Sequence, residues 1–100
     1  MSDNRPVTLV ILGASGDLTH RLLLPGLGTL LRARPDLDVR LVGAAYDTLD
    51  QGEWRKRVSE ALADGGCRVE RAEQMASETR YTQLDVTDPA AMSAFLAEVD

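Results

Sequence analysis

Short apolar runs alternate along the chain with longer segments of helical period. VTLVIL (7–12) and VRLVGAA (39–45) are unbroken apolar runs of strand length, so each predicts a β-strand. The first is followed by glycine and is expected to be buried on both faces of a sheet. TRYTQLDV (79–86) is a weaker third strand, expected nearer an edge.

A leucine-rich helix is predicted between the first two strands, over residues 18–34. Its leucines recur at i, i+4, i+7 and i+8, which are Leu23, Leu27, Leu30 and Leu31. Pro25 cannot donate a backbone hydrogen bond, so we expect a kink there or a regular helix that starts close to it. Pro35 follows as a stop signal.

Two further helices are predicted downstream. The first carries apolar residues at the same spacing and ends at a glycine pair, namely Trp54, Val58, Ala61 and Leu62, then Gly65 and Gly66. The second has Pro89 at its first position and Thr87 or Asp88 as its cap. The charged residues 67–78 between them predict a short helix or a loop.

The resulting order is βαβαβα, which requires a parallel sheet with helices on its faces. We therefore predict an α/β protein in which residues 1–100 form one Rossmann-type half of a doubly wound fold. A helical pattern continues to the last residue without a capping glycine, and the first strand lacks a partner on one side. Both features predict an N-terminal fragment of a longer protein, with the substrate domain absent. The alternative is a chain of this length that pairs with another chain.

Composition narrows the classes of partner. The 100 residues carry a net charge of −5, which argues against nucleic acid and anionic membrane surfaces. A single cysteine, Cys67, excludes an internal disulfide and a cysteine metal cluster, and we expect no metal site. The polar N-terminus lacks the pattern of a signal peptide, so a cytoplasmic location is expected.

The turn after the first strand reads GASGDLTH (13–20) and has the features of a phosphate-binding loop. Gly13 permits a tight turn, and Gly16 lets a pyrophosphate approach the main chain at the start of a helix. Ser15 offers a hydroxyl group. The spacing is G-x-x-G with Thr19 at the third glycine position of the usual fingerprint, so a plain turn capped by Asp17 is the alternative.

The ends of the second and third strands supply further candidates. Asp47 is placed to bind ribose hydroxyls, or alternatively to cap the next helix. Tyr46 is placed to stack on adenine or to cover the sheet edge. Val86 and Thr87 are placed to line an adenine pocket. Asp85 is placed to face the adenine amino group or, alternatively, is solvated while Asp88 caps the next helix.

The run Gly13–Ala14–Ser15–Gly16–Asp17–Leu18, followed by LLP (23–25), resembles the N-terminus of glucose-6-phosphate dehydrogenases. The VGAA segment (42–45), the Glu53–Trp54 pair and DVTD (85–88) also match the layout of that family. The resemblance covers essentially the whole chain but only the first part of the family's proteins.

The resemblance implies an NAD(P)-dependent oxidoreductase that oxidises the C1 hydroxyl of a sugar phosphate, glucose 6-phosphate, to a lactone. The cofactor, NADP or NAD, would lie on the turn formed by Gly13, Ala14, Ser15, Gly16, Asp17, Leu18, Thr19 and His20. The catalytic residues would lie outside these 100 residues, and the full-length enzyme would be a homo-oligomer. A short-chain dehydrogenase or epimerase, or a non-catalytic dinucleotide-binding module, are the alternatives.

Two positions depart from the family pattern. Leu22 stands where the family usually has a lysine near the active site, and a leucine cannot donate to a phosphate or hydroxyl group. Tyr46 stands where the family commonly has the arginine that holds the 2′-phosphate of NADP.

His20, the one histidine, is expected to be solvated or adjacent to phosphate rather than a general base.

Overall fold

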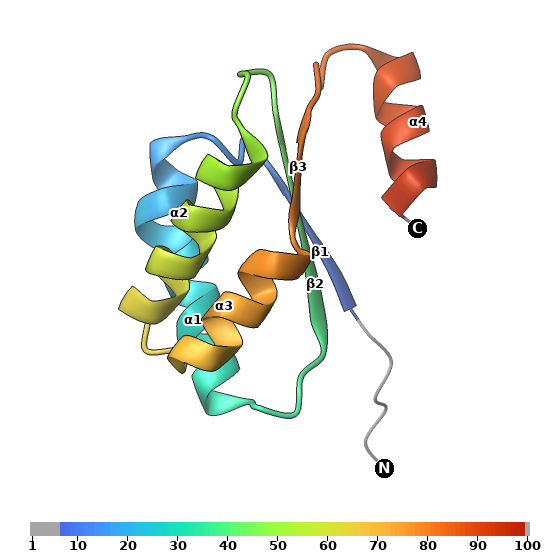
Figure 1. Cartoon of the computed structure of the whole chain (residues 1–100). Helices are drawn as coiled ribbons and strands as arrows, with labels where there is room; N and C mark the ends of the chain where they lie inside the picture. Colours follow the sequence, from blue (N-terminus) through green and yellow to red (C-terminus); the bar gives the residue numbers. More distant parts are fainter. Residues whose placement is uncertain (1–6, 100) are drawn as a thin grey trace.

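The computed structural model describes residues 7–99 and contains a three-stranded parallel sheet (Figure 1). The strands β1 (Val7–Leu12), β2 (Val39–Ala45) and β3 (Arg80–Gln83) lie in the order β1-β2-β3. The pairing places Ile11 beside Gly43 and Gly43 beside Tyr81. The predicted α/β architecture with a parallel half-sheet is confirmed.

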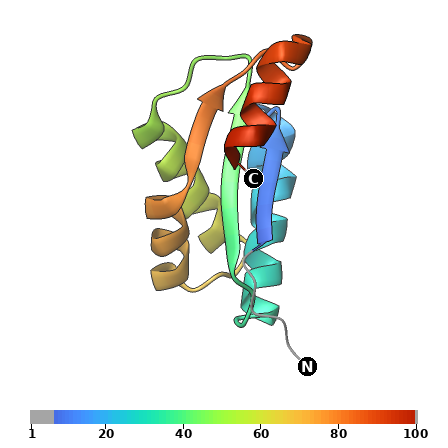
Figure 2. The same ribbon diagram turned by 90° about the vertical axis from the view of Figure 1, so that its right-hand side faces the viewer.

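Helices cover the two faces of the sheet unequally. α1 (Leu24–Ala33), α2 (Gln51–Asp64) and α3 (Val69–Glu78) pack on one face, while α4 (Pro89–Val99) lies across the other (Figures 1 and 2). The segment 67–78, predicted as a short helix or a loop, is therefore mostly the helix α3. The larger core lies between the sheet and the three helices, and a smaller one lies under α4.

β2 is the buried centre of the sheet, with six of its seven residues buried. The prediction that β1 is buried on both faces is wrong. Val7 is 55% exposed and Leu12 49% exposed, because β1 lies at an edge of the described sheet and α4 covers little of it. Its apolar composition nevertheless suits its parallel pairing with β2.

The first helix opens with one wider turn, η1 (Thr19–Leu23), a π-helical segment that leads into α1. The N–H of Leu24 donates to the carbonyl of Thr19, five residues back. Pro25 explains this turn, since its ring would clash with the carbonyl four residues earlier in a regular α-helix. The regular helix thus starts next to Pro25, which was one of the two predicted arrangements.

The buried face of α1 differs from the predicted one. Leu24, Leu27 and Leu31 are buried, whereas Leu23 and Leu30 are about half exposed, at 45% and 46%. The reason is Gly28, where an added Cβ would lie 2.3 Å from the carbonyl oxygen of Leu62 in α2. The two helices approach so closely at this glycine that it fixes the rotation of α1.

α2 confirms its predicted pattern, because its four predicted apolar residues are all buried. Its cap is Asp50, whose carboxylate accepts the N–H of Gly52 at 2.9 Å, so the alternative reading of Asp47 as that cap is wrong. Gly65 ends the helix and Gly66 follows with a φ of +101°, a conformation that favours glycine.

β3 is shorter than predicted, because the chain turns soon after Gln83. The N–H of Leu84 still donates to the carbonyl of Ala45 at 2.7 Å. Beyond it, the N–H of Asp88 donates to the carbonyl of Asp85 at 3.1 Å, which forms a turn before α4.

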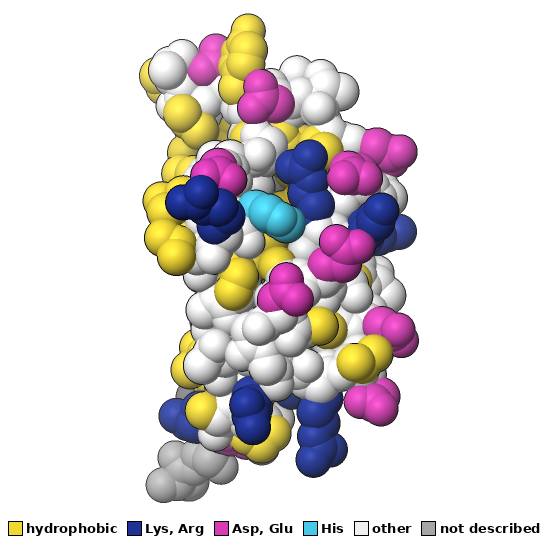
Figure 3. Space-filling view, turned by 90° about the vertical axis from the view of Figure 1, so that its left-hand side faces the viewer, with side chains coloured by type: hydrophobic (Ala, Val, Ile, Leu, Met, Phe, Trp, Pro, Cys, Tyr) yellow, Lys and Arg dark blue, Asp and Glu magenta, His cyan; other side chains and the backbone are white. Residues whose placement is uncertain are grey.

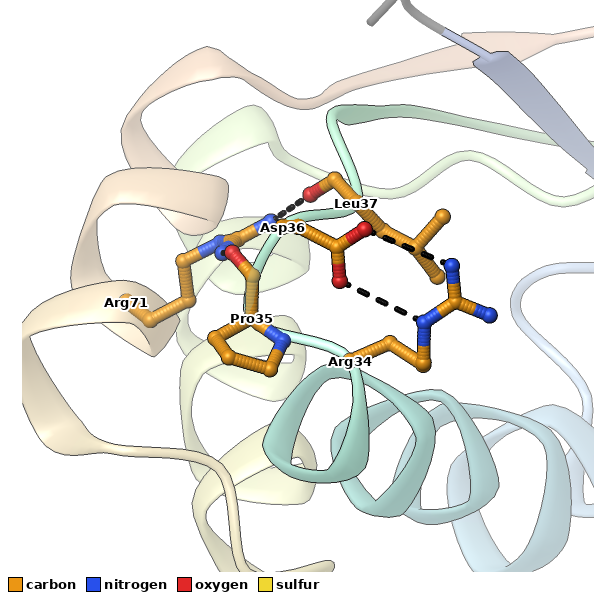
Figure 4. A network of polar contacts seen from close by, with 5 residues as sticks. All are labelled: Arg34, Pro35, Asp36, Leu37 and Arg71. Carbon is orange, nitrogen blue, oxygen red and sulfur yellow. Dashed lines mark hydrogen bonds and ion pairs between the residues drawn. The ribbon is translucent and has the colours of Figure 1, made fainter. Parts of the chain in front are cut away.

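Two arginines hold the connection between α1 and β2, at the end of the sheet opposite the glycine turn (Figure 4). Arg34 forms two hydrogen bonds of 3.3 Å with the carboxylate of Asp36, which lower the pKa of that carboxyl group. Arg71, from α3, donates to the carbonyls of Pro35, at 3.1 Å, and Leu37. The backbone entering β2 is thereby fixed to two different helices.

The core tryptophan lies directly beneath the strand ends. An added Cβ on Gly43 would lie 2.6 Å from the indole ring of Trp54 and 2.9 Å from the Cβ of Ala14. The indole N–H donates to the hydroxyl of Thr79 at 3.0 Å, and that hydroxyl donates to the carbonyl of Leu41 at 2.7 Å. Gly43 therefore leaves the space in which the indole supports the glycine turn.

No helix within residues 7–99 combines the length and the apolar character needed to cross a membrane. Within the same residues, no three histidine, cysteine or acidic side chains come together as metal ligands.

Candidate functional site

A groove runs across the carboxyl ends of the three strands, where ligands bind in open parallel sheets. Three segments line it, each following one strand. The lining residues are Gly13, Ser15, Gly16, Ala45, Tyr46, Asp47, Leu84, Asp85, Val86 and Thr87. Seven of the twelve predicted site residues therefore meet in one groove, although they are spread over more than 70 positions of the sequence.

The glycine turn closes one side of this groove. Gly13 has a φ of +77°, which L side chains rarely adopt, so this position requires glycine. The N–H of Gly16 donates to the carbonyl of Gly13 at 2.9 Å, and the N–H of His20 donates to the carbonyl of Gly16 at 3.3 Å. The helical hydrogen bonding thus begins at Gly16, and the start of a helix, where N–H groups lack partners within the helix, is a place that favours an anion.

Two residues of the turn lie beneath it rather than in the groove. Ala14 is 3% exposed and packs against Trp54 and Gly43. Thr19 is 3% exposed, and its hydroxyl donates to the carbonyl of Gly13 at 3.1 Å. Thr19 stands at the third glycine position of the usual fingerprint and stabilises the turn from its buried side.

The outer side of the turn forms a separate cleft with α2. Asp17 and His20 line it together with Ser15 and Gly16 and with four charged residues of α2, namely Glu53, Lys56, Arg57 and Glu60. Figure 3 shows the histidine among acidic and basic side chains on this face. Asp17 is itself the first helical residue and forms an ion pair with Arg21 at 3.3 Å, so the alternative interpretation of Asp17 as the helix cap is wrong.

Two leucines of this region are largely exposed. Leu18 and Leu22 each expose 60% of their surface. Leu18, predicted as part of the cofactor site, does not line the groove, and its predicted role there stays untested. Leu22, at the position where the family usually has a lysine, offers no polar group.

Asp47 connects the end of β2 to the glycine turn. The hydroxyl of Ser15 donates to Oδ2 of Asp47 at 2.8 Å, across 32 residues of sequence. Tyr46, which also lines the groove, is 72% exposed. Both residues are placed where an adenosine ribose and its adenine would lie, and that role stays a prediction.

The third lining segment has a defined turn of its own. Asp85 Oδ1 accepts the N–H of Thr87 at 2.9 Å and the hydroxyl of Thr87 at 2.6 Å, which lowers the pKa of Asp85. Asp88 caps α4 by accepting the N–H of Ala90 at 3.0 Å. Val86 is 48% exposed, so it offers an apolar wall to the groove.

Sequence reasoning missed Leu84 and Ala45 in the lining, and Tyr81 behind it. The hydroxyl of Tyr81, which is 4% exposed, donates to the carbonyl of Asp47. Alternation along the third strand gives the burial of Tyr81, but nothing in the sequence indicates which backbone carbonyl its hydroxyl reaches.

Comparison with known proteins matches this arrangement to one family. A sequence model described as "Glucose-6-phosphate dehydrogenase, NAD binding domain" matches residues 10–100. Glucose-6-phosphate 1-dehydrogenase of Aggregatibacter actinomycetemcomitans is 32% identical over 94 residues, which are 92% of this chain and 19% of that protein. The enzyme of Gluconobacter oxydans is 35% identical over 97 residues, which are 95% of this chain and 16% of that protein.

Solved structures agree with the sequence matches. Glucose-6-phosphate 1-dehydrogenase from Mycobacterium avium is 26% identical with a TM-score of 0.70, over 92% of this chain and 21% of that one. A glucose-6-phosphate dehydrogenase in complex with glucose 6-phosphate has the same fold, with a TM-score of 0.74, 22% identity and coverage of 94% and 20%. The chain spans about a fifth of the length of these relatives. It belongs to the family of the glucose-6-phosphate dehydrogenase NAD-binding domain.

Proposed function

We propose that this chain is the coenzyme-binding part of a glucose-6-phosphate 1-dehydrogenase, which oxidises the C1 hydroxyl of glucose 6-phosphate to the lactone with NAD or NADP. The observation that carries the proposal is the groove at the strand ends, closed by the Gly13–Gly16 turn. The matched relatives bear the name of that enzyme.

The chain's own residues have distinct tasks in this proposal. The Gly16 turn presents main-chain N–H groups to the pyrophosphate, while the Ser15 hydroxyl donates to Asp47 and holds that carboxylate beside the turn. Asp47 accepts ribose hydroxyls, while Tyr46 and Val86 cover the adenine. The coenzyme, when bound, takes the hydride from the sugar.

Substituting Gly16 by valine tests the coenzyme site. An added Cβ lies 3.1 Å from the carbonyl oxygen of Gly13, so the turn accommodates it with a small shift, while the two methyl groups enter the pyrophosphate's place. We expect Gly16→Val to weaken NAD and NADP binding by about tenfold or more in isothermal titration calorimetry, since each lost hydrogen bond to a charged group is worth ~1.5–3 kcal/mol.

Gly26→Val is the matched control, because a Cβ at Gly26 meets nothing within 4 Å. Circular dichroism checks that both variants keep the fold. Unchanged affinity in Gly16→Val would show that the turn is only structural.

The proposed substrate is tested with the protein as its native cell makes it. The formation of reduced coenzyme is followed by absorbance at 340 nm. Reduction that depends on glucose 6-phosphate, and not on glucose, is the expected result. Coenzyme binding without any such reduction would leave a dinucleotide-binding module and overturn the proposed activity.

A further inference from the structure

The Ser15–Asp47 hydrogen bond joins the first two strand–helix turns at the mouth of the groove. One carboxylate oxygen of Asp47, Oδ2, accepts the Ser15 hydroxyl at 2.8 Å. A carboxylate accepts up to about four hydrogen bonds, so Asp47 has acceptor capacity left for a ligand.

Hydrogen bonds from side chains of β3 hold the backbone around Asp47. Tyr81 donates its hydroxyl to the carbonyl of Asp47, and Gln83 donates its side-chain amide to the carbonyl of Tyr46 at 3.1 Å. Gln51, at the start of α2, bonds in turn to the backbone N–H of Tyr81 at 3.0 Å. Asp47 is thus presented from a fixed backbone rather than from a free loop, and its charge has a defined place.

The charged side chains among the described residues that line the groove are acidic. Among the described residues that line it, Asp47 and Asp85 are acidic and no lysine or arginine is present. Lys56 and Arg57 line the separate cleft on the other side of the turn. There Glu53 forms an ion pair with Arg57 at 3.4 Å, and Asp17, His20 and Glu60 line the same cleft.

We infer that Asp47 makes this site selective for NAD over NADP, an inference that rests on the proposed coenzyme-binding function. The 2′- and 3′-hydroxyls of the NAD ribose donate hydrogen bonds, which a carboxylate accepts. NADP replaces the 2′-hydroxyl by a phosphate that carries about −1.5 to −2 charges at neutral pH. That phosphate offers no such donor and is repelled by Asp47, and the lining residues that the structure describes include no lysine or arginine to offset the repulsion.

Isothermal titration calorimetry with NAD⁺ and with NADP⁺ tests the inference, because it needs no turnover. We expect NAD⁺ to bind the unmodified protein about tenfold or more tightly than NADP⁺, since the Asp47 carboxylate accepts from a ribose hydroxyl but repels a phosphate. In Asp47→Asn the ratio is expected to fall to about threefold or less. The amide keeps the size of the side chain and its bond from Ser15 but not the charge.

Asp38→Asn is the matched control, because Asp38 lies at the opposite end of the sheet, before β2, and this variant removes the same charge. It is expected to keep the ratio of the unmodified protein. Equal affinities for the two coenzymes in the unmodified protein, or an unchanged ratio in Asp47→Asn, would overturn the selectivity and leave coenzyme binding intact. Binding of neither coenzyme would overturn both the selectivity and the proposed function.

Discussion

The close contact between α1 and α2 predicts how a glycine-to-alanine substitution in α1 changes the stability of the protein. Two glycines of that helix, one at the contact and one away from it, test the prediction. Gly26 and Gly28 both lie in α1, and neither has a positive φ. A Cβ on Gly26 meets nothing within 4 Å, whereas a Cβ on Gly28 meets the backbone of Leu62 at 2.3 Å. The same substitution, glycine to alanine, should therefore have opposite effects at the two positions.

The magnitude follows from two opposing terms. Alanine is favoured over glycine inside a helix by about 1 kcal/mol, and this gain applies at both positions. At Gly28 the helices must also separate by about 1 Å to reach ordinary contact, which stretches the 2.8 Å bond from the Thr29 hydroxyl to the Gly65 carbonyl. Overpacking costs ~1–3 kcal/mol, and the upper end applies because the obstacle is backbone.

We therefore expect Gly28→Ala to lower the free energy of unfolding by roughly 1–2 kcal/mol and Gly26→Ala to raise it by ~0.5–1 kcal/mol. For a domain of this size, the loss at Gly28 corresponds to a fall in Tm of roughly 4–16 °C. Urea denaturation followed by the fluorescence of Trp54, the one tryptophan, measures both variants. A Gly28→Ala protein as stable as the unmodified one would refute the close contact of α1 with α2.

Two further predictions concern Thr79 and Asp85. Thr79→Val keeps the shape of a side chain that is 1% exposed but leaves the Trp54 indole N–H unpaired, so unfolding in urea should show a loss of about 1–3 kcal/mol. Thr79→Ser should restore most of it, and a neutral valine variant would contradict this role. The Thr87 bonds lower the pKa of Asp85 in the folded protein. They therefore stabilise the fold above the unfolded pKa of about 3.9, and this stabilisation is lost as the pH falls through the folded value. In Thr87→Val an NMR titration should show the pKa of Asp85 closer to its ordinary value, and an unmoved pKa would assign the shift to another cause.

The core and the candidate site are connected through one residue. Trp54 packs against Ala14 of the glycine turn through the space that Gly43 leaves open. Thr79 holds the indole from the other side. The position of the glycine turn therefore depends on the packing of α2 against the sheet, and a loosened core would also loosen the turn.

Several features of this protein follow from the sequence itself, because they depend on local chemistry. Unbroken apolar runs identify β1 and β2, helical spacing identifies α2, and a glycine between strand and helix identifies the tight turn after β1. The pattern at Pro89 likewise indicates where α4 begins.

Only the tertiary structure decided the remaining features, because each depends on contacts between distant segments. The leucines of α1 lie at helical spacing on two different faces of the helix, so their spacing does not determine which face is buried. The close approach of Leu62 to Gly28 determines it. Two aspartates follow β2, and both suit a cap, but Asp50 caps α2 while Asp47 accepts the hydroxyl of Ser15. A sequence fixes which groups can donate and accept hydrogen bonds, whereas the fold fixes which of them meet.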